Sequence, residues 1–224
     1  MLRQSIFPAI ALCLLLACQQ QKTIGGETIS LADTLDQKDE TASSIILFFG
    51  NSLTAGYGLD SLEAFPELIG RRLDSLSLNY KVVNAGLSGE TTASGRNRID
   101  WVLQQEVSIL VLELGANDGL RGIDPSETKE NLGAIIDIFH EKNPKGKVLL
   151  AGMEVPPNMG PDYAAKFRVI FKDLAVEYDI ALVPFLLKGV GGEEKLNQAD
   201  GIHPTGEGHQ ILADNVWLVL HDML

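Results

Sequence analysis

Residues 45–56 read Ile-Ile-Leu-Phe-Phe-Gly-Asn-Ser-Leu-Thr-Ala-Gly, and the rest of the chain is organised around this stretch. Its five apolar residues stop at Gly50, and polar residues and a second glycine follow. An apolar run of this length predicts a buried strand, and the segment after it predicts a tight loop. Ser52 then lies just beyond the carboxyl end of a strand, where open α/β sheets bind their ligands.

Strand and helix patterns alternate from Ser44 to the end of the chain. Four further apolar runs predict strands at Val82–Ala85, Ile109–Leu114, Val148–Met153 and Ile180–Pro184. Amphipathic helical patterns lie between and after them, at 65–76, 91–105, 125–139, 167–174 and 212–223. Strands that are apolar on both faces and alternate with helices predict a parallel sheet covered on both sides. We therefore predict one α/β domain, a three-layer α/β/α sandwich with a five-stranded parallel sheet.

Polar and glycine-rich segments follow these strands. They are Gly50-Asn51-Ser52, Asn84 to Thr91, Gly115 to Gly119 and Glu154 to Asn158, and Asp200-Gly201-Ile202-His203-Pro204 precedes the last helix. The carboxyl ends of parallel strands share one edge of the sheet. Residues far apart in the sequence are therefore expected to meet in one pocket.

Length and charge narrow the possible functions. The chain has 224 residues, is 45% hydrophobic and carries a formal net charge of −12. This acidity argues against a nucleic-acid partner, which requires basic patches, and against simple electrostatic binding to anionic lipid. The four histidines lack a metal-ligand spacing such as His-x-x-x-His, so we expect no metal and no cofactor.

The first 17 residues have the pattern of a secretory signal peptide. A short start with Arg3 precedes the apolar run Ile6–Leu16. A helix of this length spans about 16 Å, too little for a hydrocarbon core of about 30 Å. We predict removal of residues 1–17.

The end of this segment, Leu15-Leu16-Ala17-Cys18, resembles a bacterial lipobox, in which cleavage precedes a cysteine that then carries lipid. We expect lipidated Cys18 and a flexible linker over residues 18–43, followed by the folded domain at 44–224. The expected location is an exported, membrane-anchored lipoprotein facing the periplasm or cell surface. The alternative is an ordinary signal peptide with a chance cysteine.

Ser52, His203 and Asp200 are the candidate catalytic residues. A serine hydroxyl becomes a nucleophile when a histidine removes its proton, and a carboxylate then fixes the tautomer of the ring. The short loop from Asp200 to His203 lets the carboxylate turn back onto the imidazole. Candidate donors for the resulting oxyanion are the Ser52 and Gly89 backbone N–H groups and the Asn117 side-chain amide.

Several other residues are assigned to the neighbourhood of this site. Leu53, Pro156 and Ile202 are candidates for the substrate pocket. His209, in the first turn of the last helix, is placed to reach the mouth of the site but has no carboxylate to orient it. Glu113, at the end of an apolar strand, is expected to be buried and hydrogen-bonded, with no assigned role.

Four sequence blocks resemble the SGNH (GDSL) hydrolase family, across essentially the whole of residues 44–224. They are Gly50-Asn51-Ser52-Leu53, Gly89 after Asn84-Ala85-Gly86, Gly115-Ala116-Asn117-Asp118, and Asp200-Gly201-Ile202-His203-Pro204. The third and fourth blocks are most similar to the bacterial arylesterase, acyl-CoA thioesterase I and lysophospholipase L1 group.

This resemblance implies a flavodoxin-like strand order 2-1-3-4-5. It implies Ser52 as nucleophile, His203 as base and Asp200 as its orienter, with Gly89, Asn117 and Ser52 as oxyanion donors. The chain departs from the family at Asn51, where an aspartate is usual, which puts the local hydrogen bonds and substrate preference in doubt.

We therefore predict a serine esterase that acts on small acyl esters, with thioesters and lysophospholipids as candidate substrates. The alternative within the enzyme class is a carbohydrate O-acetylesterase, and the alternative outside it is a non-catalytic surface-binding lipoprotein. A flavin- or nucleotide-binding flavodoxin-like protein is disfavoured because the first strand exit lacks a phosphate loop. The sequence leaves the oligomeric state open.

Overall fold

The computed structural model describes residues 43–224. The predicted signal peptide, the lipidation site at Cys18 and all but the last residue of the predicted linker lie outside the described residues. The strands are β1 (Ser44–Gly50), β2 (Tyr80–Gly86), β3 (Ile109–Glu113), β4 (Lys147–Ala151) and β5 (Ala181–Val183). The helices are α1 (Ser52–Ala55), α2 (Phe65–Ser75), α3 (Thr92–Val102), α4 (Ala116–Arg121), α5 (Pro125–Lys142), α6 (Pro161–Glu177) and α7 (Gly206–Leu220).

All five strands pair in parallel, in the order β2-β1-β3-β4-β5, which confirms the predicted topology. β1 lies between β2 and β3, so the end of the first strand has a neighbour on each side. In this register Gly50 is level with Gly86 of β2 and with Glu113 of β3. The segments that follow these three strands therefore begin at the same height along the sheet.

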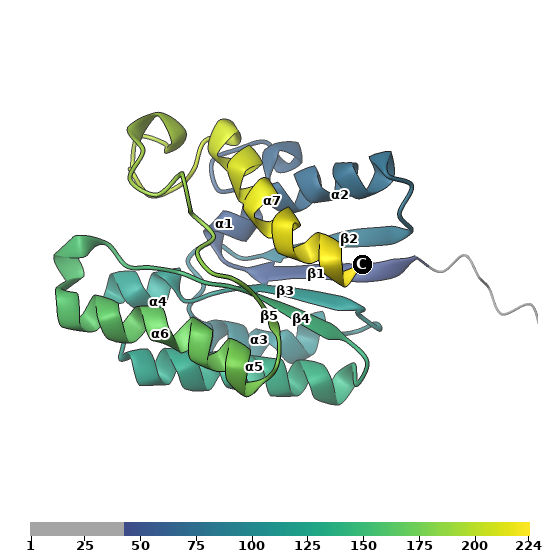
Figure 1. Ribbon diagram of the computed structural model, residues 1–224, viewed down its shortest axis with the longest axis horizontal. Coiled ribbons are helices and arrows are strands. Elements are labelled where there is room, and N and C mark those ends of the chain that lie inside the picture. Colours follow the sequence, from purple (N-terminus) through teal and green to yellow (C-terminus); the bar gives the residue numbers. More distant parts are fainter. Residues whose placement is uncertain (1–42) are drawn as a thin grey trace, which may run out of the picture. The chain divides into compact units, whose positions relative to one another are not determined.

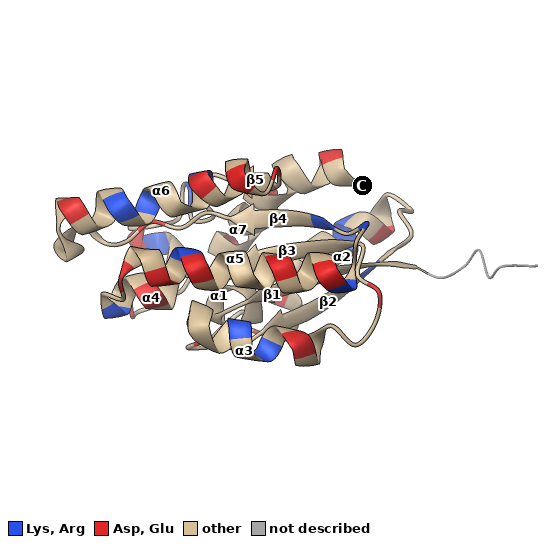
Figure 2. Cartoon of the chain, turned by 90° about the horizontal axis from the view of Figure 1, so that it is seen from below, with Lys and Arg blue, Asp and Glu red and all other residues tan. Residues whose placement is uncertain are grey.

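Helices cover both faces of the sheet, as Figure 1 shows, and the fold is the predicted three-layer sandwich. α2 and α7 pack together on one face, while α3, α5 and α6 pack side by side on the other. Figure 2 shows charged residues distributed along α3, α5 and α6, while apolar residues of the same helices belong to the buried core. Ile46 to Phe49 of β1 and all of β3 are buried, as expected for parallel strands covered on both sides.

The observed elements differ from the predicted ones mainly at their ends. α6 begins at Pro161, six residues before the first predicted position, because its first turns are partly exposed and carry no continuous apolar stripe. β4 ends at Ala151, before the predicted Met153. Gly152, the residue after β4, still donates its N–H to the Val183 carbonyl of β5 at 2.8 Å, and the strand does not continue beyond Ala151. The short helices α1 and α4 were not predicted, because four and six residues are too few for a periodic pattern.

Candidate active site

The turn that follows β1 holds Ser52 in a fixed position. Asn51 is the N-cap of α1, and its side-chain oxygen accepts a hydrogen bond from the Leu53 N–H at 3.0 Å. Ser52 is the first residue of that helix and is 9% exposed. Gly50 is required here, because a Cβ at this position would lie 2.1 Å from the Thr54 hydroxyl oxygen.

The loop before α7 folds back on itself and orients His203. Asp200 Oδ1 accepts hydrogen bonds from the backbone N–H groups of Ile202 and His203, both at 3.0 Å. Gly201 adopts a φ of 73°, a left-handed conformation that glycine takes without strain. These two bonds and the bond to the His203 ring lower the pKa of Asp200 to about 2, with the ring as the main cause. The carboxylate therefore stays ionised through the neutral range.

The structure brings Ser52, His203 and Asp200 into one hydrogen-bonded chain, although Ser52 and His203 are 151 residues apart. His203 Nε2 lies 2.9 Å from Ser52 Oγ, and His203 Nδ1 lies 2.6 Å from Asp200 Oδ2. The Tyr57 ring lies against the imidazole, with 4.5 Å between ring centroids. This arrangement positions the imidazole to accept a proton from the serine hydroxyl while the carboxylate binds the opposite ring nitrogen.

The three predicted oxyanion donors border the same cavity. Asn117, in the first turn of α4, donates one amide hydrogen to the Glu90 carbonyl oxygen at 3.0 Å. Since a side-chain amide has two N–H groups, this bond orients the amide and leaves one donor available. Within residues 43–224, the backbone N–H groups of Ser52 and Gly89 donate to no protein acceptor. All three can therefore bind a ligand oxygen.

A partly buried ion pair between Arg98 and Glu90 supports the segment that holds Asn117. The Glu90 carboxylate accepts hydrogen bonds from Arg98 Nε at 2.7 Å and from Nη2 at 2.5 Å. Arg98 also donates to the Ala85 carbonyl at 2.9 Å, and its guanidinium lies 4.3 Å from the centroid of the Phe49 ring. These contacts join β1, β2 and α3 to the Glu90 carbonyl, so they position the Asn117 amide indirectly.

A cavity of about 630 Å³ opens above Ser52 and His203. The three residues predicted for the substrate pocket, Leu53, Pro156 and Ile202, all line it. Its other apolar lining residues include Tyr57, Leu120, Met153, Val155, Phe185 and Leu187. The lining of the cavity is therefore mostly apolar, and it includes the Ser52 and His203 side chains.

His209 lies outside this cavity, so the prediction that it reaches the mouth of the site was wrong. Its side chain is 1% exposed, and Nδ1 accepts a hydrogen bond from the Phe65 N–H at 3.1 Å. Phe65 opens α2, where a backbone N–H has no acceptor within its own helix. Burial, with a smaller contribution from His203, lowers the pKa of His209 to about 4. The ring therefore has a structural role, as a neutral acceptor between α7 and α2.

His209 should make the fold less stable as the pH falls from about 6.5 to 4. In this pH range His209 is protonated in the unfolded chain but stays neutral in the folded protein, so a fall in pH favours unfolding. We expect His209→Asn, which keeps an acceptor, to remove roughly 2–3 kcal/mol of this pH dependence. Urea unfolding of both proteins at pH 7 and pH 4.5 measures it, with His221→Asn at an exposed histidine as control. Equal pH dependence in the wild type and His209→Asn would contradict the role.

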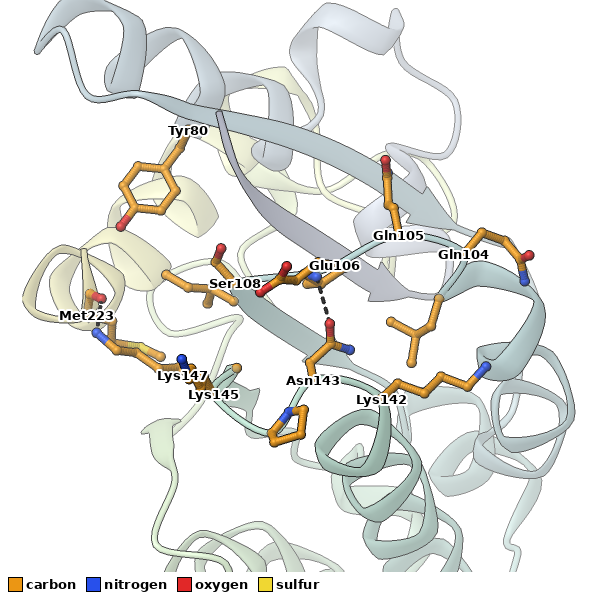
Figure 3. A pocket seen from close by; sticks show the side chains of 15 residues that line it. Tyr80, Gln104, Gln105, Glu106, Ser108, Lys142, Asn143, Lys145, Lys147 and Met223 are labelled. Carbon is orange, nitrogen blue, oxygen red and sulfur yellow. Dashed lines mark hydrogen bonds between the residues drawn. The ribbon is translucent and has the colours of Figure 1, made fainter. Parts of the chain in front are cut away.

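A second hollow, of about 710 Å³, lies at the opposite edge of the sheet, where the strands begin (Figure 3). Its lining includes Lys142, Lys145 and Lys147. Lys142 pairs with Asp100 at 2.8 Å, and Lys147 donates to the Met223 carbonyl at 2.5 Å. These contacts occupy two of the three lysines within the fold, and no candidate catalytic residue lies near this hollow.

In the described part of the chain, no three or more His, Cys, Asp or Glu residues are grouped so as to hold a metal ion. Over residues 43–224, no helix combines the length and hydropathy needed to cross a membrane.

Residues 48–211 match the GDSL-like lipase/acylhydrolase family. The chain belongs to that family. The match includes Ser52 and His203 and covers most of the folded region, and it confirms the resemblance drawn from the four sequence blocks. At the level of the family, the prediction of a hydrolase acting on ester bonds is also confirmed.

Related proteins and structures agree with this assignment. The chain is 39% identical over 186 residues to esterase TesA of Pseudomonas aeruginosa, covering 83% of this chain and 92% of that protein. It is 36% identical over 174 residues to thioesterase 1/protease 1/lysophospholipase L1 of Escherichia coli K12, covering 77% of this chain and 81% of that protein. A crystal structure of TesA matches the fold with a TM-score of 0.78 at 39% identity, covering 81% of this chain and 100% of that one.

Sequence reasoning missed two features of this GDSL-family site. Tyr57 contacts the His203 ring, yet nothing in its spacing or surroundings sets it apart from an ordinary loop aromatic. Glu113 was expected to be buried, but its partners Asn51 and Thr54 were not foreseen. The single signal for that contact was an acidic residue at the end of an apolar strand.

Proposed function

We propose that the protein hydrolyses carboxylic acyl esters through a Ser52-His203-Asp200 triad and an acyl-enzyme intermediate. One observation carries the proposal. The two nitrogens of the His203 ring lie within hydrogen-bond distance of the Ser52 hydroxyl and the Asp200 carboxylate, at the base of an open cavity.

In the first half of the reaction, Ser52 Oγ forms a bond to the acyl carbon and its proton passes to His203 Nε2. The carbonyl electron pair moves onto oxygen, which accepts hydrogen bonds from Asn117 and from the Ser52 and Gly89 N–H groups. The bond to the alcohol then breaks, and the leaving oxygen takes the proton from Nε2.

In the second half, water takes the place of the alcohol. His203 Nε2 removes a proton from water as its oxygen bonds to the acyl carbon, and then returns the proton to Ser52 Oγ as the acyl-serine bond breaks. The ionised Asp200 stabilises the imidazolium formed in both halves. The products are a carboxylic acid, an alcohol and the free enzyme.

The apolar lining of the cavity favours an acyl chain over a sugar as the group bound beside Ser52. The relatives named esterase and thioesterase/lysophospholipase support oxygen esters, thioesters and lysolipids as substrate classes. The runner-up is the removal of O-acetyl groups from carbohydrates, which a mostly apolar lining favours less.

A panel of p-nitrophenyl esters from acetate to palmitate, with palmitoyl-CoA, a lysophospholipid and acetylated xylan, tests the proposed substrate class. We expect kcat/KM to rise with chain length until the cavity is filled, and to exceed the value for acetylated xylan. Preference for the acetylated glycan over every acyl-chain ester would favour the runner-up. If the protein neither turns over any ester nor reacts with a fluorophosphonate probe, it is a non-catalytic binding protein instead.

Replacing Asn117 with alanine should lower kcat by about 10²–10³-fold, because one oriented oxyanion donor is lost. KM should change less, because the bond strengthens as charge develops on the substrate oxygen. Steady-state kinetics with p-nitrophenyl butyrate measure both constants. Asn158→Ala, at an exposed asparagine outside the cavity lining, is the matched control. Equal kcat values for the two variants would remove Asn117 from the mechanism.

We also propose that the protein is exported and anchored to a membrane by lipid on Cys18. The lipobox-like sequence ending at Cys18 supports this location. Cys18→Ser should move the protein from the membrane fraction to the soluble fraction and abolish incorporation of labelled palmitate. An unchanged distribution between the fractions would contradict the anchor.

A further inference from the structure

Glu113, the last residue of β3, lies beneath the turn that carries Ser52, and the mechanism above gives it no task. Its side chain is fully buried, at 0% exposed. Oε2 accepts hydrogen bonds from the Asn51 N–H at 3.1 Å, the Thr54 N–H at 3.2 Å and the Thr54 hydroxyl at 2.8 Å. Oε1 accepts a bond from Asn51 Nδ2 at 2.7 Å. Four donors, from residues on both sides of Ser52, therefore converge on one carboxylate.

The Asn51 amide connects this carboxylate to the nucleophile. Its Nδ2 end donates to Glu113, while its Oδ1 end accepts from the Leu53 N–H at 3.0 Å and lies 3.3 Å from the Ser52 hydroxyl oxygen. An amide donates at one end and accepts at the other, so an acceptor at position 113 fixes which end faces Ser52.

We propose that Glu113 and Asn51 form a matched acid–amide positioning pair, which holds the Ser52 hydroxyl in line with His203. The inference rests on the proposed function, because it assigns the pair to the orientation of that nucleophile. Glu113 does not line the cavity, and it acts through Asn51 and the α1 turn.

The surroundings of Glu113 contain hydrogen-bond donors but no counter-ion. Burial raises the pKa of Glu113 to about 7, and the bonds from Thr54 and Asn51 act in the opposite direction. No charged group in the described part of the chain contributes to this shift. The carboxylate therefore depends on its four donors, three of which are N–H groups that cannot accept a proton from it.

This geometry predicts how exchanges of acid and amide should behave. In Glu113→Gln, the NH₂ group of the new amide replaces one of the two carboxylate oxygens. Because both oxygens accept from donors of Asn51 or Thr54, this NH₂ group faces another donor in either orientation, and a buried hydrogen bond is lost. Asn51→Asp with Glu113→Gln exchanges the two groups, and the amide at 113 can then donate to the carboxylate at 51. Asn51→Asp alone places two carboxyl groups together, and they must share one proton to avoid repulsion.

The test compares the wild type, Glu113→Gln, Asn51→Asp and the double variant by kcat/KM for p-nitrophenyl butyrate from pH 7 to pH 10. Glu113→Gln should lose about 100-fold at pH 7, and the double variant should recover to within about fivefold of the wild type. The ratio of the Asn51→Asp kcat/KM to the wild-type kcat/KM should fall at least about fivefold between pH 7 and pH 10, because the two carboxyl groups lose their shared proton. For the double variant, which has a single carboxyl group here, the same ratio should stay constant over this range.

Glu106→Gln, at an exposed glutamate on the opposite edge of the sheet, controls for the loss of an acid, and thermal unfolding checks the fold of every variant. If Glu113→Gln does not fold, the contrast in pH dependence between Asn51→Asp and the double variant still decides the question. Three results would each overturn the positioning pair. They are full activity in Glu113→Gln, a kcat/KM for the double variant no higher than that of Glu113→Gln, and the same pH dependence of relative kcat/KM in Asn51→Asp and in the double variant. An inactive wild type would instead overturn the proposed function, and this inference with it.

Discussion

Replacing Ser52 with alanine should reduce kcat/KM for p-nitrophenyl butyrate by on the order of 10⁵–10⁶-fold, close to the limit of detection. The Ser52 hydroxyl oxygen lies 2.9 Å from His203 Nε2, and alanine leaves the imidazole without this hydroxyl to activate. The variant should also fail to react with a fluorophosphonate probe, since the probe forms its bond to that oxygen.

The fold should survive this change, because Ser52 begins a four-residue helix that is capped by Asn51 and held from below by Glu113. Thermal unfolding within a few degrees of the wild type would show that activity was lost through chemistry. Ser61→Ala, at an exposed serine outside the cavity lining, is the control and should keep full activity. Residual turnover above about one hundredth of the wild-type rate would mean that another nucleophile carries the reaction.

Replacing Asp200 with asparagine should reduce kcat by about 10⁴-fold through the wrong tautomer of His203. Asp200 Oδ1 is held by two backbone N–H groups, and the asparagine oxygen will keep that place. The amide NH₂ then replaces Oδ2, 2.6 Å from His203 Nδ1, and donates to it. The ring proton is forced onto Nε2, where it faces the serine hydroxyl and blocks proton removal.

Kinetics across pH 6 to 9 should show the loss of rate at every pH, because Asp200, with its pKa lowered to about 2, is ionised throughout. Asp74→Asn, at an exposed acid, is the matched control. The proton signals of the His203 ring in a nuclear magnetic resonance spectrum would report the tautomer directly. A variant that retained more than a tenth of wild-type kcat would contradict the orienting role.

The position of the catalytic candidates was predictable because each sits where an apolar run stops or just before the last amphipathic helix. Parallel strands put their carboxyl ends at one edge, so Ser52 and Asn117 had to lie near each other once the strands were recognised. The approach of His203 to Ser52 depended on how the loop after β5 returns across that edge, and no periodic pattern encodes such a path. The resemblance to a known family, rather than the residues alone, supplied the strand order.

The contacts beneath the site were beyond sequence reasoning for a different reason. The bonds from Asn51 and Thr54 to Glu113 depend on strand register, which places Glu113 level with Gly50 of β1. A shift of one residue would turn the carboxylate to the other face of the sheet. His209 shows the same limit, since the free N–H of Phe65 that determines its orientation becomes visible only when α2 and α7 are packed together.

The wide separation of Ser52 and His203 along the chain also bears on when the enzyme can first act. Ser52, the proposed nucleophile, follows β1, whereas His203, its proposed base, precedes α7. A nascent or truncated chain that lacks the final segment should therefore have no reactive centre. In a refolding reaction, the recovery of hydrolysis should therefore lag behind the formation of secondary structure and coincide with the docking of α7. The onset of catalysis would thus report the docking of α7.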